Sequence, residues 1–360
     1  MAFVQKTVDF FLGSLSPSGF TGWFREAAAE PDTRPYLIKA GPGCGKSTFM
    51  RRVAERDFAS PCVELLHCSS DPASLDGAKL PGCGALLLDA TAPHTLDCKF
   101  PGAEERVLSF YDTLNDPYLQ ANRDEILAAA RNNAAHLRRA AALFALYCGL
   151  QQQARQEAAQ ALLLPKLTRD AQRLAARTMP ARAAAAPGAR RHRLLSAPTP
   201  GGVTFFYDTI PALADTLYAL HDPYGAAAPR VLQILADHAR ANGYDAILCH
   251  DPADQTQLEH LLIPALRLAF VTANSEHPML FADQINLRAA RWMDPAQLAP
   301  HSAAIRREKQ LAAGLLADVC AEETAAKAAH DEIERWYVAA TDFAAVDGIR
   351  AALERELFCR

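Results

Sequence analysis

Short apolar runs, each bounded by Gly, Pro or Asp, occur in two groups along the chain. The first group is Tyr36–Lys39, Val63–His67 and Ala85–Asp89, and the second is Leu217–Leu220, Ala246–Cys249 and Arg267–Val271. Apolar runs of this length that alternate with helical patterns are typical of parallel strands covered on both faces. The pattern therefore predicts two α/β domains, each with a parallel sheet.

Long segments almost free of Gly and Pro follow each group of strands. In the first of them, 122–163, the apolar residues Leu143, Leu146, Tyr147 and Leu150 recur at helical spacing. The segments 302–337 and 341–358 show the same kind of pattern. We expect a long helical hairpin after each sheet.

The two groups of strands are parts of an internal repeat. The segment SPSGFTGWF at 16–24 matches TPGGVTFFY at 199–207, and LPGCGALLLDATAPH at 80–94 matches IPALRLAFVTANSEH at 263–277. Pro81 and Pro264, like His94 and His277, are 183 residues apart. Matching landmarks in the same order predict a tandem duplication. The expected domains are 1–178 and 194–360, joined by a basic, Ala/Pro/Gly-containing linker at 179–193.

A phosphate-binding loop follows the first strand of the first copy. Its residues are Ala40, Gly41, Pro42, Gly43, Cys44, Gly45, Lys46, Ser47 and Thr48. The glycines let the backbone aim its N–H groups at phosphate oxygens, and the next helix adds its positive N-terminal end. Lys46 supplies a charge for the β and γ phosphates, Ser47 a hydroxyl ligand for Mg²⁺, and Thr48 a hydrogen bond for the α phosphate. The motif departs from its usual form at Ala40, which replaces a glycine. The fold class is thus two tandem P-loop NTPase-like domains.

Asp89 ends the apolar run 85–89 and is the expected second ligand of Mg²⁺, in the position of a Walker B aspartate. Residue 90 is alanine, so the glutamate that follows this aspartate in many ATPases is missing. Candidates to orient a water or an acceptor hydroxyl are Asp71, Asp76 and His94, which follow neighbouring strands. Each of the three also fits a turn or capping role. No guanine-recognition motif follows the strands, which favours ATP over GTP.

The second copy has lost this chemistry. The sequence alignment sets Ala227 opposite Lys46, Ala228 opposite Ser47 and Thr272 opposite Asp89. We expect no Mg·ATP binding in this copy.

Composition limits the expected partners and cellular compartment of the protein. The net charge of −4 and a pI near 6.3 give no electrostatic reason to expect a nucleic-acid partner. Nine scattered cysteines indicate reduced thiols, and the spacing of His67, Cys68, Cys83, His94 and Cys98 does not favour a metal site. The longest apolar run, 140–150, is about half of the roughly 20 residues that a membrane span needs. We expect a cytoplasmic protein.

The loop, the stretch HCSSDPASLDG at 67–77, the run LLLDATAPH at 86–94 and FPGAEE at 100–105 together resemble an uncharacterised family of tandem P-loop ATPases from Gram-positive bacteria. The resemblance covers nearly the whole chain and implies ATP binding. In that family both copies usually carry a phosphate loop, so the altered second loop is a departure.

Three functions fit the sequence. The first is a Mg-dependent ATPase whose second copy is an inactive partner. The second is a kinase that phosphorylates a small molecule. The third is an ATP-dependent switch or scaffold that binds a protein partner and does not hydrolyse ATP.

Overall fold

The computed structural model describes residues 6–57, 62–182, 186–274 and 277–359. The chain divides into two compact units. The first unit consists of Met1–Ala141, Ala197–Thr204 and Val319–Arg360, and the second of Ala142–Ser196 and Phe205–Asp318. Each unit is described below by itself.

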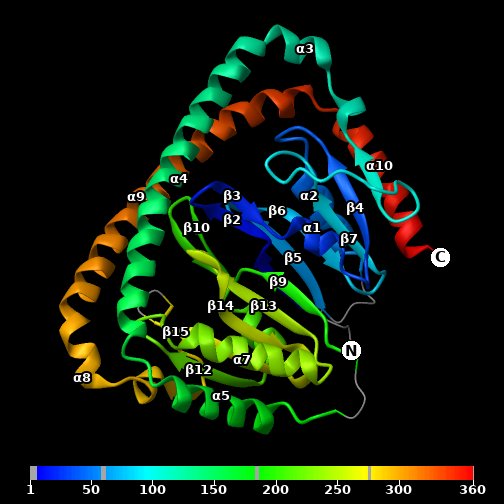
Figure 1. The fold of residues 1–360 in the computed structure, drawn as a ribbon. Helices are drawn as coiled ribbons and strands as arrows, with labels where there is room; N and C mark the ends of the chain where they lie inside the picture. The colour runs from blue at the N-terminus through cyan, green and yellow to red at the C-terminus, as the bar shows by residue number, and fades with distance from the viewer. Residues whose placement is uncertain (1–5, 58–61, 183–185, 275–276, 360) are drawn as a thin grey trace. The chain divides into compact units, whose positions relative to one another are not determined.

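The first unit is built on a six-stranded sheet (Figure 1). Its strands are β1 (Lys6–Phe11), β4 (Arg34–Lys39), β5 (Cys62–Cys68), β6 (Asp71–Leu80), β7 (Ala85–Asp89) and β8 (Arg106–Ser109), in the order β1-β5-β6-β7-β4-β8. Strand β6 is antiparallel to β5 and β7, whereas the other pairs are parallel. The prediction of a purely parallel sheet is therefore wrong. Between the second and third predicted strands, the chain forms the additional strand β6. It is antiparallel because a tight turn returns the chain directly alongside β5 and no crossover helix is needed.

The smaller elements of the first unit surround this sheet. They are the hairpin β2 (Gly13–Ser16) and β3 (Gly19–Gly22), the helices α1 (Phe24–Ala28), α2 (Lys46–Ala54) and α3 (Asp116–Ala121), and the 3₁₀ turn η1 (Tyr111–Thr113).

The sheet of the second unit repeats that order. Its strands are β9 (Arg190–Arg193), β12 (Thr216–His221), β13 (Ala246–Asp251), β14 (Asp254–Ile263), β15 (Leu268–Ala273) and β16 (Ile285–Arg288), in the order β9-β13-β14-β15-β12-β16. Strand β14 is antiparallel to its neighbours, as β6 is in the first sheet. The shared order and the shared antiparallel strand match the predicted duplication.

Apart from α7 and the two C-terminal helices described below, the remaining elements of the second half are short. They are the hairpin β10 (Ser196–Thr199) and β11 (Gly202–Phe205), the helices α6 (Thr209–Leu213), α7 (Ala228–Ala241) and α8 (Pro295–Leu298), and the 3₁₀ turns η2 (Pro264–Leu266), η3 (Ala289–Trp292) and η4 (Ala299–His301).

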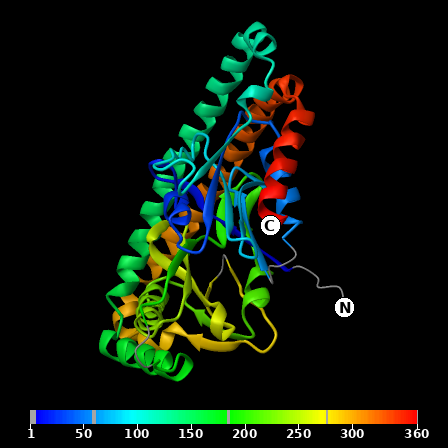
Figure 2. The same ribbon diagram turned by 90° about the vertical axis from the view of Figure 1, so that its right-hand side faces the viewer.

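Two long helices, α4 (Arg123–Ala159) and α9 (Ser302–Ala340), confirm the predicted helical segments. Within the first unit, the beginning of α4 and the end of α9 run side by side (Figures 1 and 2). The Asn133 amide donates a hydrogen bond to the Ala326 carbonyl at 2.8 Å, and the carboxylate of Glu322 lies 2.7 Å from His136 Nδ1. The long helices thus pack on each other rather than in two separate hairpins.

The helices that follow them, α5 (Leu164–Thr178) and α10 (Phe343–Phe358), are exchanged between the copies. Helix α5 belongs to the first copy by sequence, but its apolar residue Leu174 packs in the core of the second unit with Val231 of α7. Helix α10 belongs to the second copy, but Val346 and Leu353 pack in the core of the first unit. The compact units therefore differ from the predicted bounds 1–178 and 194–360, because each core buries the apolar face of the other copy's last helix.

The predicted linker, 179–193, contains an ordered strand. Residues 183–185 lie outside the described residues, but Arg190–Arg193 form β9 and pair in parallel with β13. This end of the segment is an edge strand, and the linker assignment is wrong there.

Within the residues that the structure describes, no helix combines the length and the apolar character that crossing a membrane requires.

Candidate functional site

The predicted phosphate loop connects the end of β4 to the beginning of α2. Gly43 and Gly45 have φ values of +67° and +82°, which residues with a side chain rarely adopt. Gly45 is the N-cap of α2, and Lys46 is the first residue of the helix. The loop therefore places Lys46 at the positive end of a nine-residue helix.

Lys46 and Asp89 lie together, as the sequence predicts. Strands β4 and β7 are parallel neighbours with Ile38 opposite Asp89, so their carboxyl ends meet at one edge of the sheet. The Lys46 ammonium lies 3.4 Å from Asp89 Oδ2 and donates a hydrogen bond to the Gly41 carbonyl at 2.8 Å. Asp89 Oδ1 accepts hydrogen bonds from the backbone N–H and the hydroxyl of Thr91. A lysine and a carboxylate are thus fixed beside the loop.

The side chains of Ser47, Cys44 and Thr48 differ in their contacts and in their exposure to solvent. Ser47 Oγ accepts a hydrogen bond from the Leu75 N–H at 3.0 Å, which ties the loop to β6. Cys44 is fully buried in the core, and its thiol lies 3.5 Å from the Pro42 carbonyl. Thr48 is exposed. The predicted oxygen ligands of Mg²⁺, on Ser47 and Asp89, fit the preference of that ion for hard oxygen donors.

The last turns of α9 and the first residue of α10 pack on the three glycines of the loop. A Cβ atom at Gly41 would lie 2.5 Å from the Tyr337 ring, one at Gly43 would lie 2.9 Å from the Glu334 carbonyl, and one at Gly45 would lie 3.3 Å from Phe343. These glycines are therefore required by helix packing as well as by any bound phosphate. Sequence reasoning missed these α9–α10 residues because they are about 290 positions away along the chain.

The Glu334 carboxylate of α9 also interacts with a backbone N–H of the loop. Hydrogen bonds from His330 and from the Gly43 N–H lower the pKa of this carboxylate, against the effect of burial. A negative group therefore already interacts with one N–H of the loop.

Of the three candidate bases, Asp76 and His94 come together. His94 Nε2 lies 3.3 Å from Asp76 Oδ2, and both side chains are buried. The His94 ring stacks on Phe24 with centroids 4.3 Å apart. Burial is the largest single influence and lowers the pKa of His94, but the Asp76 and Asp89 carboxylates together raise it above its ordinary value. The histidine is thus held near both carboxylates.

Asp71 lies elsewhere. It is the first residue of β6, where it accepts hydrogen bonds from the Ala73 N–H and the Ser74 hydroxyl. Its carboxylate lies 3.7 Å from the ammonium of Lys327 on α9. These contacts support the turn role that the sequence left open.

The second copy has a different arrangement at the corresponding loop. Helix α7 begins at Ala228 as α2 begins at Lys46, so Ala228, and not Ala227, is the structural equivalent of Lys46. The fully buried carboxylate of Asp222 accepts hydrogen bonds from the Ala227 and Ala228 N–H groups at 2.7 and 2.8 Å. An internal anion therefore satisfies the helix N-terminus that a phosphate would otherwise bind.

The second copy nevertheless keeps a histidine–carboxylate pair. His277 Nε2 lies 3.3 Å from Glu259 Oε1, in the positions of His94 and Asp76. The pair persists where the lysine and the Walker B aspartate are lost. Formation of the pair therefore does not require the residues of the predicted nucleotide site.

A cavity of about 500 Å³ adjoins the second loop. It is lined by Gly225, Ala226 and Pro229, and by side chains of α4, α5, α7 and β14. Arg155 of α4 reaches into it and is ion-paired with Asp251.

Comparisons with protein-family models, curated proteins and solved structures gave no match to this chain. The family assignment stays a prediction, and the function is argued from the site alone.

Proposed function

We propose that the first copy binds the phosphates of ATP together with Mg²⁺ and that the protein is a Mg-dependent ATPase. The observation that carries the proposal is the Lys46–Asp89 pair, 3.4 Å apart, at the N-terminus of α2 and beside a loop with two glycines in the left-handed region. Two adjacent parallel strands bring these groups to one edge of the sheet, where ligands bind in open α/β folds.

Each residue has a stated task in this proposal. The loop N–H groups and the Lys46 ammonium bind phosphate oxygens, while Ser47 and Asp89 provide oxygen ligands for the metal. When bound, Mg²⁺ neutralises phosphate charge. The buried His94–Asp76 pair is the candidate for orienting a water molecule.

A non-hydrolysing switch is the second candidate function, and a specific contact favours it. Nucleotide phosphates and the Glu334 carboxylate compete for the Gly43 N–H, so ATP binding would release the α9–α10 turn from the loop. In a switch, this release would expose a surface to a protein partner. The kinase alternative predicts instead that ADP release depends on a small-molecule acceptor.

The test measures Mg·ATP affinity by calorimetry and ADP release with a coupled assay. The Lys46→Ala and Asp89→Asn variants should each bind Mg·ATP roughly 10- to 100-fold more weakly, since charge-assisted hydrogen bonds contribute about 1.5–3 kcal/mol. Lys166→Ala is the matched control, because its ammonium bonds to the Arg291 carbonyl in the second unit.

The outcomes separate the candidates. Binding with ADP release that is lost in His94→Asn supports the ATPase, whereas binding with negligible release in the wild type supports the switch. Unchanged affinity in Lys46→Ala, or no wild-type affinity for any nucleoside triphosphate, would overturn the nucleotide site itself.

A further inference from the structure

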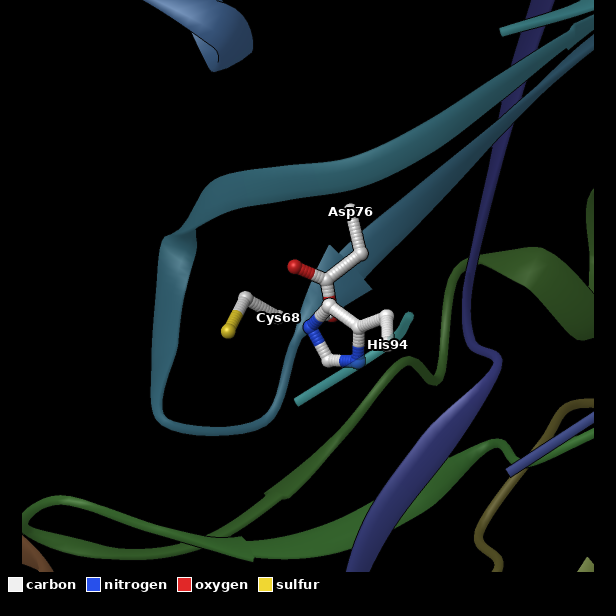
Figure 3. A group of neighbouring side chains, drawn as sticks. All are labelled: Cys68, Asp76 and His94. Atoms are coloured by element: carbon white, nitrogen blue, oxygen red, sulfur yellow. Dashed lines mark ion pairs between the residues drawn. The ribbon is translucent and has the colours of Figure 1, made fainter. Parts of the chain in front are cut away.

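Three metal-binding side chains meet in the first unit. Cys68 ends β5, Asp76 lies within β6, and His94 follows β7. One ligand atom from each residue lies within 4.8 Å of the others (Figure 3). Sequence spacing did not reveal this set, because the antiparallel β6 brings Asp76 back beside the end of β5.

Two side chains of the cluster are buried, Cys68 is partly buried, and two polar atoms of the cluster are unsatisfied. Asp76 and His94 are 4% and 8% exposed. Among the described residues, neither His94 Nδ1 nor Asp76 Oδ2 has a hydrogen-bond partner, and Asp76 Oδ2 lies 3.3 Å from His94 Nε2. Buried polar groups are normally hydrogen-bonded, so unsatisfied atoms in such a cluster call for an occupant. A cation between the three side chains would satisfy Asp76 Oδ2, whereas His94 Nδ1 points away from the other two side chains (Figure 3).

The donor atoms select the kind of cation. A thiolate, an imidazole and a carboxylate form a ligand set typical of Zn²⁺, whereas Mg²⁺ prefers oxygen alone. Tetrahedral Zn²⁺ with bonds of about 2.0–2.3 Å places its ligand atoms about 3.3–3.8 Å apart. The separation of Asp76 and His94 already matches, and the sulfur needs to move by about 1 Å or less.

The backbone around Cys68 also suits a metal-bound sulfur. Burial and Asp76 raise the pKa of the free Cys68 thiol well above its ordinary value, and hydrogen bonds from the Ser70 and Asp71 N–H groups oppose this increase. A free cysteine in this setting is a poor nucleophile, because reactive cysteines are exposed and have lowered pKa values. A thiol–histidine–aspartate catalytic site is therefore disfavoured.

Among its described residues, the second copy lacks an equivalent cluster. Asp251, in the position of Cys68, is ion-paired with Arg155, and Glu259 lies 3.2 Å from His260 and 3.3 Å from His277. These carboxylates are balanced by cationic or hydrogen-bonding side chains, and no sulfur ligand is present among them.

We propose that Cys68, Asp76 and His94 bind one Zn²⁺ ion, with the fourth position taken by water or by an oxygen atom of a ligand. Such a three-ligand arrangement is typical of zinc sites that keep one position open for chemistry. The proposal goes beyond nucleotide binding and does not depend on it.

The test loads the full-length protein with Zn²⁺ or Co²⁺, removes loosely bound metal by gel filtration, and measures metal content and the absorption spectrum. We expect about one equivalent of Zn²⁺ and, for Co²⁺, a thiolate-to-metal charge-transfer band with tetrahedral d–d bands. Cys68→Ser and His94→Asn should each weaken Zn²⁺ binding by roughly tenfold or more. Cys83→Ser is the matched control, since Cys83 belongs to the same unit and its thiol contacts the Leu80 carbonyl.

The wild-type Co²⁺ spectrum keeps the proposal falsifiable even if a variant fails to fold. A spectrum without a thiolate band, or an unchanged Zn²⁺ affinity in folded Cys68→Ser, overturns the site, and the buried atoms then bind water instead. Lys46→Ala separates the two proposals, because it should retain the metal while losing nucleotide affinity.

Discussion

The two loops at the carboxyl ends of β4 and β12 are built on the same backbone plan but satisfy their helix N-terminus differently. In the second copy, Asp222 lies over the first N–H groups of α7 at 2.7–2.8 Å. In the first copy the equivalent residue is Ala40, which carries no charge, while Lys46 and Asp89 lie beside the loop. A loop of this shape creates an anion site by geometry alone. The two loops differ in whether the residue that follows the strand supplies a carboxylate to the helix N-terminus.

The largest expected effect comes from transferring that side chain. Ala40→Asp places a carboxylate beside the first N–H groups of α2, where it should repel phosphates and occupy their donors. We expect Mg·ATP affinity to fall by roughly 100-fold or more, since like charges in contact cost several kcal/mol. Calorimetric titration measures this change.

The reciprocal change, Asp222→Ala, is its control. It should destabilise the protein by about 1–2 kcal/mol through loss of a helix cap, and leave ATP affinity unchanged. Nucleotide affinity that survives Ala40→Asp would show that the two loops are not functionally equivalent positions.

A second difference between the copies predicts their response to acid. In the first copy, His67 Nε2 lies 2.7 Å from the Asp9 carboxylate, whereas in the second His250 faces His192 at 2.8 Å. Burial and the neighbouring His192 lower the pKa of His250 to about 4. The unfolded chain then binds more protons than the folded chain between pH about 6.5 and about 4, so stability is lost as the pH falls through this range.

His192→Asp recreates the first copy's pair and should remove this loss. At pH 5 we expect the variant to gain about 2 kcal/mol over the wild type, with little difference at pH 7.5. Urea unfolding at several pH values measures it. Asp9→His, the converse change, should increase acid sensitivity, and parallel pH profiles for all three proteins would contradict the explanation.

The smallest expected effect concerns Glu334, which contacts the first loop. Glu334→Ala frees the Gly43 N–H and removes a negative charge from the loop, so ATP affinity should rise about fivefold, equivalent to about 1 kcal/mol. Glu332→Ala, an exposed neighbour paired with Arg335, is the control. If Glu334→Ala binds ATP more weakly instead, this carboxylate supports nucleotide binding rather than competing with it.

Much of the local structure could be predicted from the sequence. The apolar runs mark six strands, and 85–89 is a strand with the predicted bounds. The loop pattern locates the start of α2 to within three residues, and Lys46 and Asp89 lie together because adjacent parallel strands end at the same edge. These features depend on hydrophobic periodicity, glycine conformation and the positions of strand ends, and short stretches of sequence are enough to predict them.

The tertiary structure decided which segments meet. The apolar faces of α5 and α10 are visible in the sequence, but the hydrophobic effect is non-directional and does not specify which core will bury them. Packing assigns each to the core of the other copy, and the same return of the chain brings Glu334 and Tyr337 to the loop glycines. The meeting of Cys68, Asp76 and His94 likewise depends on the tight turn that makes β6 antiparallel. The sequence by itself determined six of the strands and the position of the loop, and only long-range packing decided their partners.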